Sequence, residues 1–170
     1  DEELDVSMRE ADCAIRLTPP TQGDLIQRRL TRVHTHVFAS PTYLQKKGMP
    51  DKIGDLVQHN IIAYDEDRAM AAPNLNWLLA TVRDATNEKP NRVLTLNNLY
   101  GIFRAVEAGV GMAGLPDFLA REAQNLVRVL PELEGPGNDA FFVYPEELRN
   151  SQRIGVFRDF LLRKVAETRF

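Results

Sequence analysis

Stretches with the two-residue periodicity of strands alternate along this chain with stretches that have helical spacing. The predicted strands are Ala11–Leu17, Leu25–Leu30, Val33–Ala39, Ile61–Tyr64, 76–82 ("NWLLATV"), 92–96 ("RVLTL"), Met112–Leu115, Val127–Leu130 and 140–144. The predicted helices are 2–9, 41–47, 55–59, 98–108, 116–123 and a long one after residue 150. This alternation predicts an α/β fold with mostly parallel sheets.

The strand pattern of Val33–Ala39 stops abruptly at Ser40-Pro41. Serine is favoured as a helix N-cap, and proline suits the first helical position, where its missing amide would be unpaired anyway. Gly48 and Pro50 then end the new helix. A chain that leaves a sheet so sharply is expected to leave its lobe. A second exit is predicted at the connector "EGPGND" (134–139), so the sequence predicts two lobes joined by two crossings.

The helix "NNLYGIFRAVEAGVG" has the strongest amphipathic spacing in the chain. Leu99, Ile102, Phe103 and Val106 recur at i, i+3, i+4 and i+7. Asn97 or Asn98 can cap the amino end, where free backbone amides and the helix dipole favour a carboxylate or another oxyanion. Plain N-capping accounts for the same asparagines equally well.

Composition sets limits on the partners of this chain. The 170 residues are 44% hydrophobic and 26% charged, with a formal net charge of −3 and no basic block. These values predict a globular protein that has no electrostatic footprint for DNA or an anionic membrane of its own. The single Cys13 rules out an internal disulfide and suits the cytoplasm. No apolar run is long enough for a membrane helix.

The first residues, "DEELDVSMREADCAIRL", have the pattern of a helix that feeds a strand. In a parallel sheet, such a helix is the second half of a crossover from an earlier strand. The sequence therefore predicts an excised fragment of a longer protein.

Eight segments resemble one family when they are taken in order and at their spacing. They are "ADCAIRL", "DLIQRRL", "FASPTYLQKKGMP", "DLVQHNII", "NWLL", "AVEAGVGMAGLPDFLA", "LVRVLPEL" and "VYP". Together they cover nearly the whole chain, which is similar to the effector-binding domain of LysR-type transcriptional regulators.

The resemblance implies two Rossmann-like α/β lobes, as in type II periplasmic binding proteins, with a small-molecule cleft between them. Residues 1–39 and 138–170 would form lobe I and residues 40–137 lobe II, with Ser40 at the crossing. The family's N-terminal winged helix-turn-helix and the first strand and helix of lobe I are absent from this sequence, so the resemblance implies an incomplete cleft in the fragment.

The resemblance also points to three ligand-binding segments besides Ser40. They are Arg16, Leu17 and Thr18 after the first strand, Leu96, Asn97, Asn98 and Leu99 at the capped helix, and Ala113, Gly114 and Leu115 on a strand of lobe II. Arg16 offers a bidentate donor fork to an acid, or it braces the loop instead. Gly114 permits close approach of a ligand, or it serves a tight turn.

Other candidates have stronger structural explanations. His34 and His36 share one side of a strand but lack a third ligand, so no metal site is predicted. Cys13 in mid-strand is expected to be buried and inert. Trp77 could stack on an aromatic effector, but it is expected in the core. No nucleophile with a base, metal triad or phosphate loop is visible, so neither enzymatic activity nor a cofactor is predicted.

Two functions remain at this point. The first is an effector-sensing domain that binds a metabolite, with a carboxylate as one candidate, and couples it to DNA through an absent N-terminal domain. The resemblance implies a homodimer of these domains and a tetramer of the whole protein. The alternative is a solute-binding protein of a transport system with the same fold, which would require secretion.

Overall fold

The computed structural model describes residues 11–19, 23–65, 74–123 and 125–167. The chain divides into two compact units, each with its own sheet. The first unit takes its described residues from both ends of the chain, up to Val33 and from Asn138 onward, and the second takes the residues between them. The predicted helix at 2–9 lies outside the described residues. Among the residues that the structure describes, no helix is long and apolar enough to cross a membrane.

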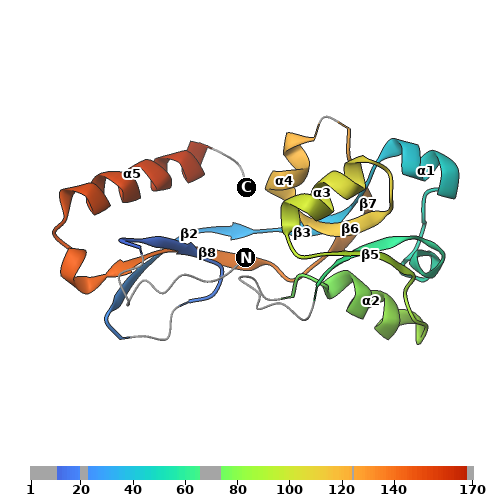
Figure 1. Ribbon diagram of the computed structural model, residues 1–170, viewed down its shortest axis with the longest axis horizontal. Helices are drawn as coiled ribbons and strands as arrows, with labels where there is room; N and C mark the ends of the chain where they lie inside the picture. Colours follow the sequence, from blue (N-terminus) through green and yellow to red (C-terminus); the bar gives the residue numbers. More distant parts are fainter. Residues whose placement is uncertain (1–10, 20–22, 66–73, 124, 168–170) are drawn as a thin grey trace. The chain divides into compact units, whose positions relative to one another are not determined.

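The first unit is a three-stranded sheet with one helix packed on it (Figure 1). The strand order is β1 (Ala14–Arg16), β8 (Asn138–Pro145), β2 (Leu25–Val33), and both pairings are antiparallel. The turn η2 (Glu146–Leu148) leads to the long helix α5 (Gln152–Glu167). Phe142 and Tyr144 of β8 pack against Ile154 of α5, and they form the small core of this unit.

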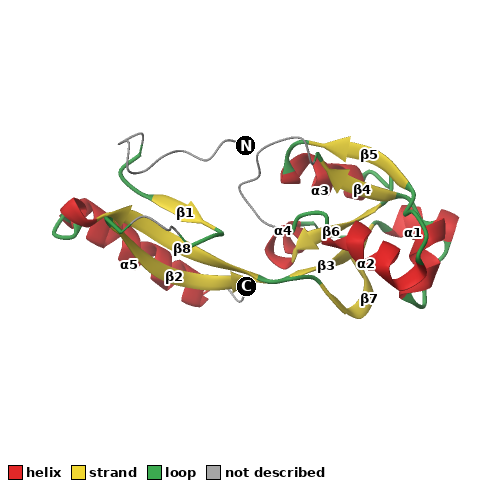
Figure 2. Cartoon of the chain, turned by 90° about the horizontal axis from the view of Figure 1, so that it is seen from below, coloured by secondary structure: helices red, strands yellow, loops and turns green. Residues whose placement is uncertain are grey.

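The second unit is a five-stranded mixed sheet with helices on both faces (Figures 1 and 2). Its strands, in spatial order, are β5 (Arg92–Leu96), β4 (Ile61–Tyr64), β6 (Met112–Pro116), β3 (Thr35–Ala39) and β7 (Val127–Glu134). Its helices, in chain order, are α1 (Pro41–Lys47), η1 (Ile53–Gln58), α2 (Trp77–Thr86), α3 (Leu99–Glu107) and α4 (Asp117–Glu122). Side chains from α1, η1 and α2 pack on one face, with Val37, Ile61 and Met112.

The expectation of mostly parallel sheets is wrong for the described strands. Only β4–β5 and β4–β6 are parallel among the pairs in these ranges. The chain leaves the first unit along β2 and returns along β8, so these two strands run in opposite directions when they pair. The strand that enters the second unit, β3, pairs in the same way with β7, which leads out of it.

The predicted strand at 76–82 is wrong, because these residues begin helix α2. The run "WLLATV" has no polar interruption, so its periodicity alone does not separate a short strand from a buried helix segment. Trp77, Leu78 and Val82 are the buried residues of α2, and they pack against the core of the second unit. The i, i+4 pair Leu78 and Val82 shares one helical face, as packing on a sheet requires.

Several local predictions are confirmed by backbone geometry. Ser40 is the N-cap of α1 and Pro41 is its first residue. Asn98, of the two candidate asparagines, caps α3. The positive φ of Gly48 and of Gly109 ends the helical course after α1 and α3.

The units divide between Val33 and His34 and again between Gly137 and Asn138. Strand β3 therefore belongs to the second unit, although residues 1–39 were assigned to lobe I from the sequence. The reason is local: Thr35–Ala39 pairs along β6 on one side and β7 on the other. Ser40 therefore lies between β3 and α1, which both belong to the second unit, and not at the crossing between the units.

Candidate functional site

The carboxyl ends of the parallel strands gather most of the predicted site residues of the second unit at one edge of its sheet. Leu96 ends β5 and pairs with Tyr64, which ends β4, and the amide of Asp65 donates to the carbonyl of Leu96 at 2.9 Å. Gly114 lies on β6, the other neighbour of β4. Strands are about 4.8 Å apart, so β5 and β6 stand about 10 Å apart across β4. Such edges are where open α/β sheets bind ligands.

The amino end of α3 supplies hydrogen-bond donors to this edge. Asn98 Oδ1 accepts from the amide of Gly101 at 2.6 Å, and Asn98 Nδ2 donates to Asn97 Oδ1 at 3.3 Å. Both asparagines are exposed. The helix has no carbonyl to offer the amides of Leu99 and Tyr100, which therefore suit water or an oxyanion.

A third asparagine, Asn76, links β4 to the start of α2. Asn76 Oδ1 accepts from the amide of Tyr64 at 2.8 Å, and Asn76 Nδ2 donates to the carbonyl of Tyr64 at 2.9 Å. These two hydrogen bonds to the backbone of Tyr64 hold the start of α2 beside the last residue of β4. The sequence did not indicate this role of Asn76, because residues 76–82 were predicted as a strand, in which Asn76 would not stand before a helix.

Two buried polar atoms on the α2 face have no hydrogen-bond partner among the described residues. They are Thr35 Oγ1, on β3, and the indole Nε1 of Trp77. Both residues are more than nine-tenths buried. Buried polar atoms are normally paired, so an unpaired donor and hydroxyl near one sheet edge are candidates to meet a water or a ligand atom. Trp77 also belongs to the core, as the sequence predicted.

The predicted residues on β6 do not present side chains to a ligand. Ala113 and Leu115 are almost fully buried, on the face opposite Gly114. The side chain of Trp77 occupies the space that Gly114 leaves open. A Cβ added to Gly114 would lie 2.6 Å from the indole nitrogen. The glycine is therefore explained by packing of α2 on the sheet, rather than by the tight turn weighed from the sequence.

Ser40 lies apart from Asn98, at the other end of α3. An added Cβ at Gly109, which follows α3, would be 3.3 Å from Ser40 Oγ and 3.0 Å from Thr42 Oγ1. The nine residues of α3 span about 14 Å. Ser40 is buried, its hydroxyl lies 3.1 Å from that of Thr42, and it caps α1.

Arg16, Leu17 and Thr18 belong to the first unit, where Arg16 pairs with Phe141 at the end of β1. Arg16 and Leu17 are half-buried, and Thr18 is exposed in the loop that follows. These three residues therefore lie at the end of a strand, as predicted.

His34, just before β3, and His36, on β3, have acidic partners, which the sequence did not predict. His34 Nδ1 lies 2.5 Å from Glu134 of β7, and His36 Nδ1 lies 2.6 Å from Asp117 of α4. The hydrogen bond from His34 lowers the pKa of Glu134. No group of three or more His, Cys, Asp or Glu side chains in the described ranges could hold a metal ion.

Comparison with known proteins identifies the family of this chain. Residues 3–166 match the family described as "LysR substrate binding domain". An uncharacterized HTH-type transcriptional regulator of Haemophilus influenzae is 28% identical over 85% of the chain and 50% of its own length. An HTH-type transcriptional regulator of Xanthomonas campestris is also 28% identical, over 96% of the chain and 48% of its own length.

Solved structures show the same fold. The regulatory domain of CrgA, a LysR-type transcriptional regulator of Neisseria meningitidis, superposes with a TM-score of 0.73 at 23% identity, over 94% of the chain and 78% of that domain. The chain spans about half the length of the curated relatives it matches. With a family match across nearly all of its residues, the chain belongs to the LysR substrate-binding domain family and has the type II periplasmic-binding-protein-like fold of LysR regulatory domains.

Proposed function

We propose that this chain is the effector-sensing part of a LysR-type transcriptional regulator. A small metabolite binds it and biases a DNA-binding domain elsewhere in the protein. The family match over residues 3–166 carries this proposal. Curated relatives that match the chain are described as HTH-type transcriptional regulators, rather than as enzymes or transport proteins.

We propose two effector-binding segments, one in each unit, and each is described by itself. In the second unit, the amino end of α3 with Asn97 and Asn98 receives an oxyanion, because its first amides and the helix dipole favour negative charge. In the first unit, Arg16 with Leu17 and Thr18 supplies a guanidinium that complements a carboxylate. A small carboxylate is therefore the effector class that we favour. Ser40 is left out, since it lies beyond the far end of α3.

Regulation through such a site needs only modest energies. A coupling free energy of about 1–3 kcal/mol between effector and operator changes either affinity about 5- to 150-fold. We place this coupling in a homodimer of the domain and a tetramer of the whole protein, acting in the cytoplasm where operator DNA is found.

A thermal-shift screen of small carboxylates and aromatic acids against the chain tests the proposal. A true effector raises the midpoint of wild-type unfolding, and Arg16→Ala and Asn98→Ala reduce that shift. Asn98→Ser is the matched control for the helix cap, because serine also caps but lacks the amide donor. A ligand that stabilises all three variants as much as wild type would show that the site has been assigned wrongly.

A further inference from the structure

The first turn of α2 reaches both segments through which the chain passes from one unit to the other. These crossing segments are residues 34–35 and residues 135–137, which lie in the second unit beside its two boundaries. A Cβ added to Gly135, in the second crossing segment, would lie 2.6 Å from Cδ2 of the Trp77 indole and 2.5 Å from Thr35 Oγ1. Trp77 therefore packs at the point where the two crossing segments meet.

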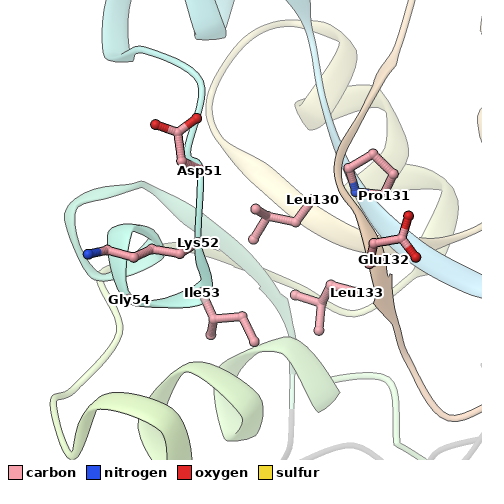
Figure 3. A pocket seen from close by; sticks show the side chains of 8 residues that line it. All are labelled: Asp51, Lys52, Ile53, Gly54, Leu130, Pro131, Glu132 and Leu133. Carbon is pink, nitrogen blue, oxygen red and sulfur yellow. The ribbon is translucent and has the colours of Figure 1, made fainter.

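The two crossing segments are joined by a backbone hydrogen bond, in which the amide of Gly135 donates to the carbonyl of Thr35 at 2.9 Å. The strand that leads to Gly135 is irregular, because Leu130–Leu133 stands out of the ladder between β7 and β3. A cavity of about 570 Å³ lies beside this bulge, and Figure 3 shows the two leucines of the bulge turned toward Ile53 across it. Because the bulge has open space beside it, the position of the second crossing segment depends on what packs against Gly135.

The indole of Trp77 is positioned by packing alone. Its Nε1 is buried and has no hydrogen-bond partner among the described residues, and the same is true of Thr35 Oγ1. The ring also packs on Gly114 of β6, whose added Cβ would lie 2.6 Å from Nε1. Since no hydrogen bond of the described residues ties the ring to the sheet, it follows the backbone of α2, and close-packed contacts transmit such a shift to their neighbours.

The backbone of α2 begins at the carboxyl edge of the sheet. Asn76, the residue before Trp77, is held to the amide and the carbonyl of Tyr64 by hydrogen bonds of 2.8 and 2.9 Å. Tyr64 pairs with Leu96, which ends β5 two residues before Asn98. A continuous series of contacts therefore runs from the amino end of α3, through the end of β4 and the start of α2, to the two crossing segments.

We propose that Asn76 and Trp77 form a relay that couples the carboxyl edge of β4 to the two crossing segments. When the backbone at Tyr64 shifts, Asn76 carries the start of α2 with it, and the indole moves against Gly135 and Thr35. Coupling of this kind is carried by contiguous packed side chains and hydrogen bonds. The part that the relay plays in regulation rests on the proposed function, because the effector is what we place at this edge.

Hydrogen exchange of the ¹⁵N-labelled chain, measured by NMR without ligand, tests the relay. The Gly135 amide exchanges only when the bond between the crossing segments opens, so its rate reports on them. Asn76→Ala removes both anchoring bonds and should speed this exchange about tenfold, since the loss of a hydrogen bond shifts a local opening equilibrium by about that factor. The Met112 amide, which donates to the carbonyl of Asn60 at 2.9 Å, should change less than about twofold. Equal acceleration at both amides, or none at Gly135, would overturn the proposal.

Asn91→Ala is the matched control for the loss of an asparagine side chain. Asn91 lies in the same unit and donates from its own side chain, to Asn60 Oδ1 at 3.0 Å. We expect this variant to leave the exchange of the Gly135 amide as it is in wild type. If Asn91→Ala speeds that exchange as much as Asn76→Ala does, the effect is not specific to the start of α2 and the relay is wrong.

Trp77→Phe tests whether Asn76 acts through the indole. The smaller ring loses part of its contact with Gly135, so this variant alone should speed exchange of the Gly135 amide. Adding Asn76→Ala to Trp77→Phe should then change the rate by less than about twofold, because two residues that act in series are not additive. If the two substitutions multiply each other's effects instead, they act independently and the proposal fails.

The step from α3 to the indole has its own signal, because Trp77 is the single tryptophan of the chain. Asn98→Ala, which removes the cap of α3, should shift the indole N–H resonance in wild type and leave it in place in the Asn76→Ala background. Asn98→Ser, which keeps a cap, should not shift it. An indole signal that Asn98→Ala does not move would overturn the relay. Each of these measurements is made without a ligand, so a failed relay leaves the effector assignment standing, and a screen without a hit leaves the relay standing.

Discussion

The indole of Trp77 covers the α-carbon of Gly114, so closely that an added methyl group would stand 2.6 Å from the indole nitrogen. The same ring covers Gly135, which lies between β7 and β8. Gly114 and Gly135 thus both leave room for the Trp77 ring. Helix α2 can pack this closely on the sheet only because neither residue has a Cβ.

Gly114→Ala should lower the free energy of unfolding by about 1–3 kcal/mol, because overpacking forces the indole or the strand to shift. Urea denaturation measures the loss. Trp77→Phe in the Gly114→Ala background should recover part of it, since the smaller ring relieves the clash. Gly155→Ala in α5 is the control: its Cβ meets open space, and it should stabilise by about 0.5–1 kcal/mol. Equal effects of the two alanines would contradict this account of Gly114.

Ser40→Ala should cost about 0.5–2 kcal/mol in urea unfolding, because it removes the side-chain cap of α1. We expect the upper part of this range, since Ser40 is buried and its hydroxyl also meets that of Thr42. Asn98→Ala removes an equivalent cap at an exposed position and should cost less. A larger loss for Asn98→Ala would show that burial does not set the strength of these caps.

Acidification through the titration range of histidine should destabilise the chain, because His59 is buried. Burial, with a smaller contribution from Lys47, lowers the pKa of His59 from 6.5, while Asp55 opposes the shift. The unfolded chain therefore takes up the proton more readily, so the stabilising contribution is complete above pH 6.5 and is lost as pH falls through the folded pKa. Urea midpoints between pH 8 and pH 5 should fall in wild type and fall less in His59→Gln. A slope that the substitution leaves unchanged would assign the effect to another group.

His34→Gln should raise the pKa of Glu134 toward 4.5, its ordinary value, because the hydrogen bond from His34 is the main cause of its depression. A group with a depressed pKa stabilises the fold above its unfolded pKa, and this contribution is lost as pH falls. The carboxyl ¹³C signal of Glu134, followed by NMR through acid titration, measures the change. His59→Gln should leave this titration as it is in wild type, and an unaltered pKa in His34→Gln would contradict the assignment.

Local signals in the sequence predicted the helix ends well. Ser40 with Pro41, and Asn98 before a strongly amphipathic run, were recognisable because capping depends on the side chain at one position and the spacing that follows. Helix α2 was not recognisable. Its apolar run "WLLATV" satisfies a buried strand as readily as a helix, and its packing under Gly114 and Gly135 depends on residues far along the chain.

The pairing of the strands and the burial of the site residues could not be predicted from local sequence patterns either. The antiparallel partners β2 and β8 come from opposite ends of the chain, so no spacing within either strand reveals them. Residues Leu130–Leu133 bulge out of the ladder between β7 and β3. In the sequence they have the pattern of a strand end, because Pro131 interrupts the alternation. The sequence did place Asn98 at the amino end of a helix, where it caps α3. The burial of Ala113, Leu115 and Ser40, in contrast, is a property of the assembled core.

The pairing of Val33 with Asn138 has a consequence for the order of folding. The ladder between β2 and β8 can close only after the long insertion between them has brought its two ends together, and contacts between residues so distant in sequence form slowly. Collapse of the inserted residues into their own sheet shortens the effective loop and lowers the entropy lost on closure. We therefore expect the inserted unit to form first and the β1–β8–β2 sheet to be completed last. Substitutions in α5 should then speed unfolding and leave the early folding phase unaltered.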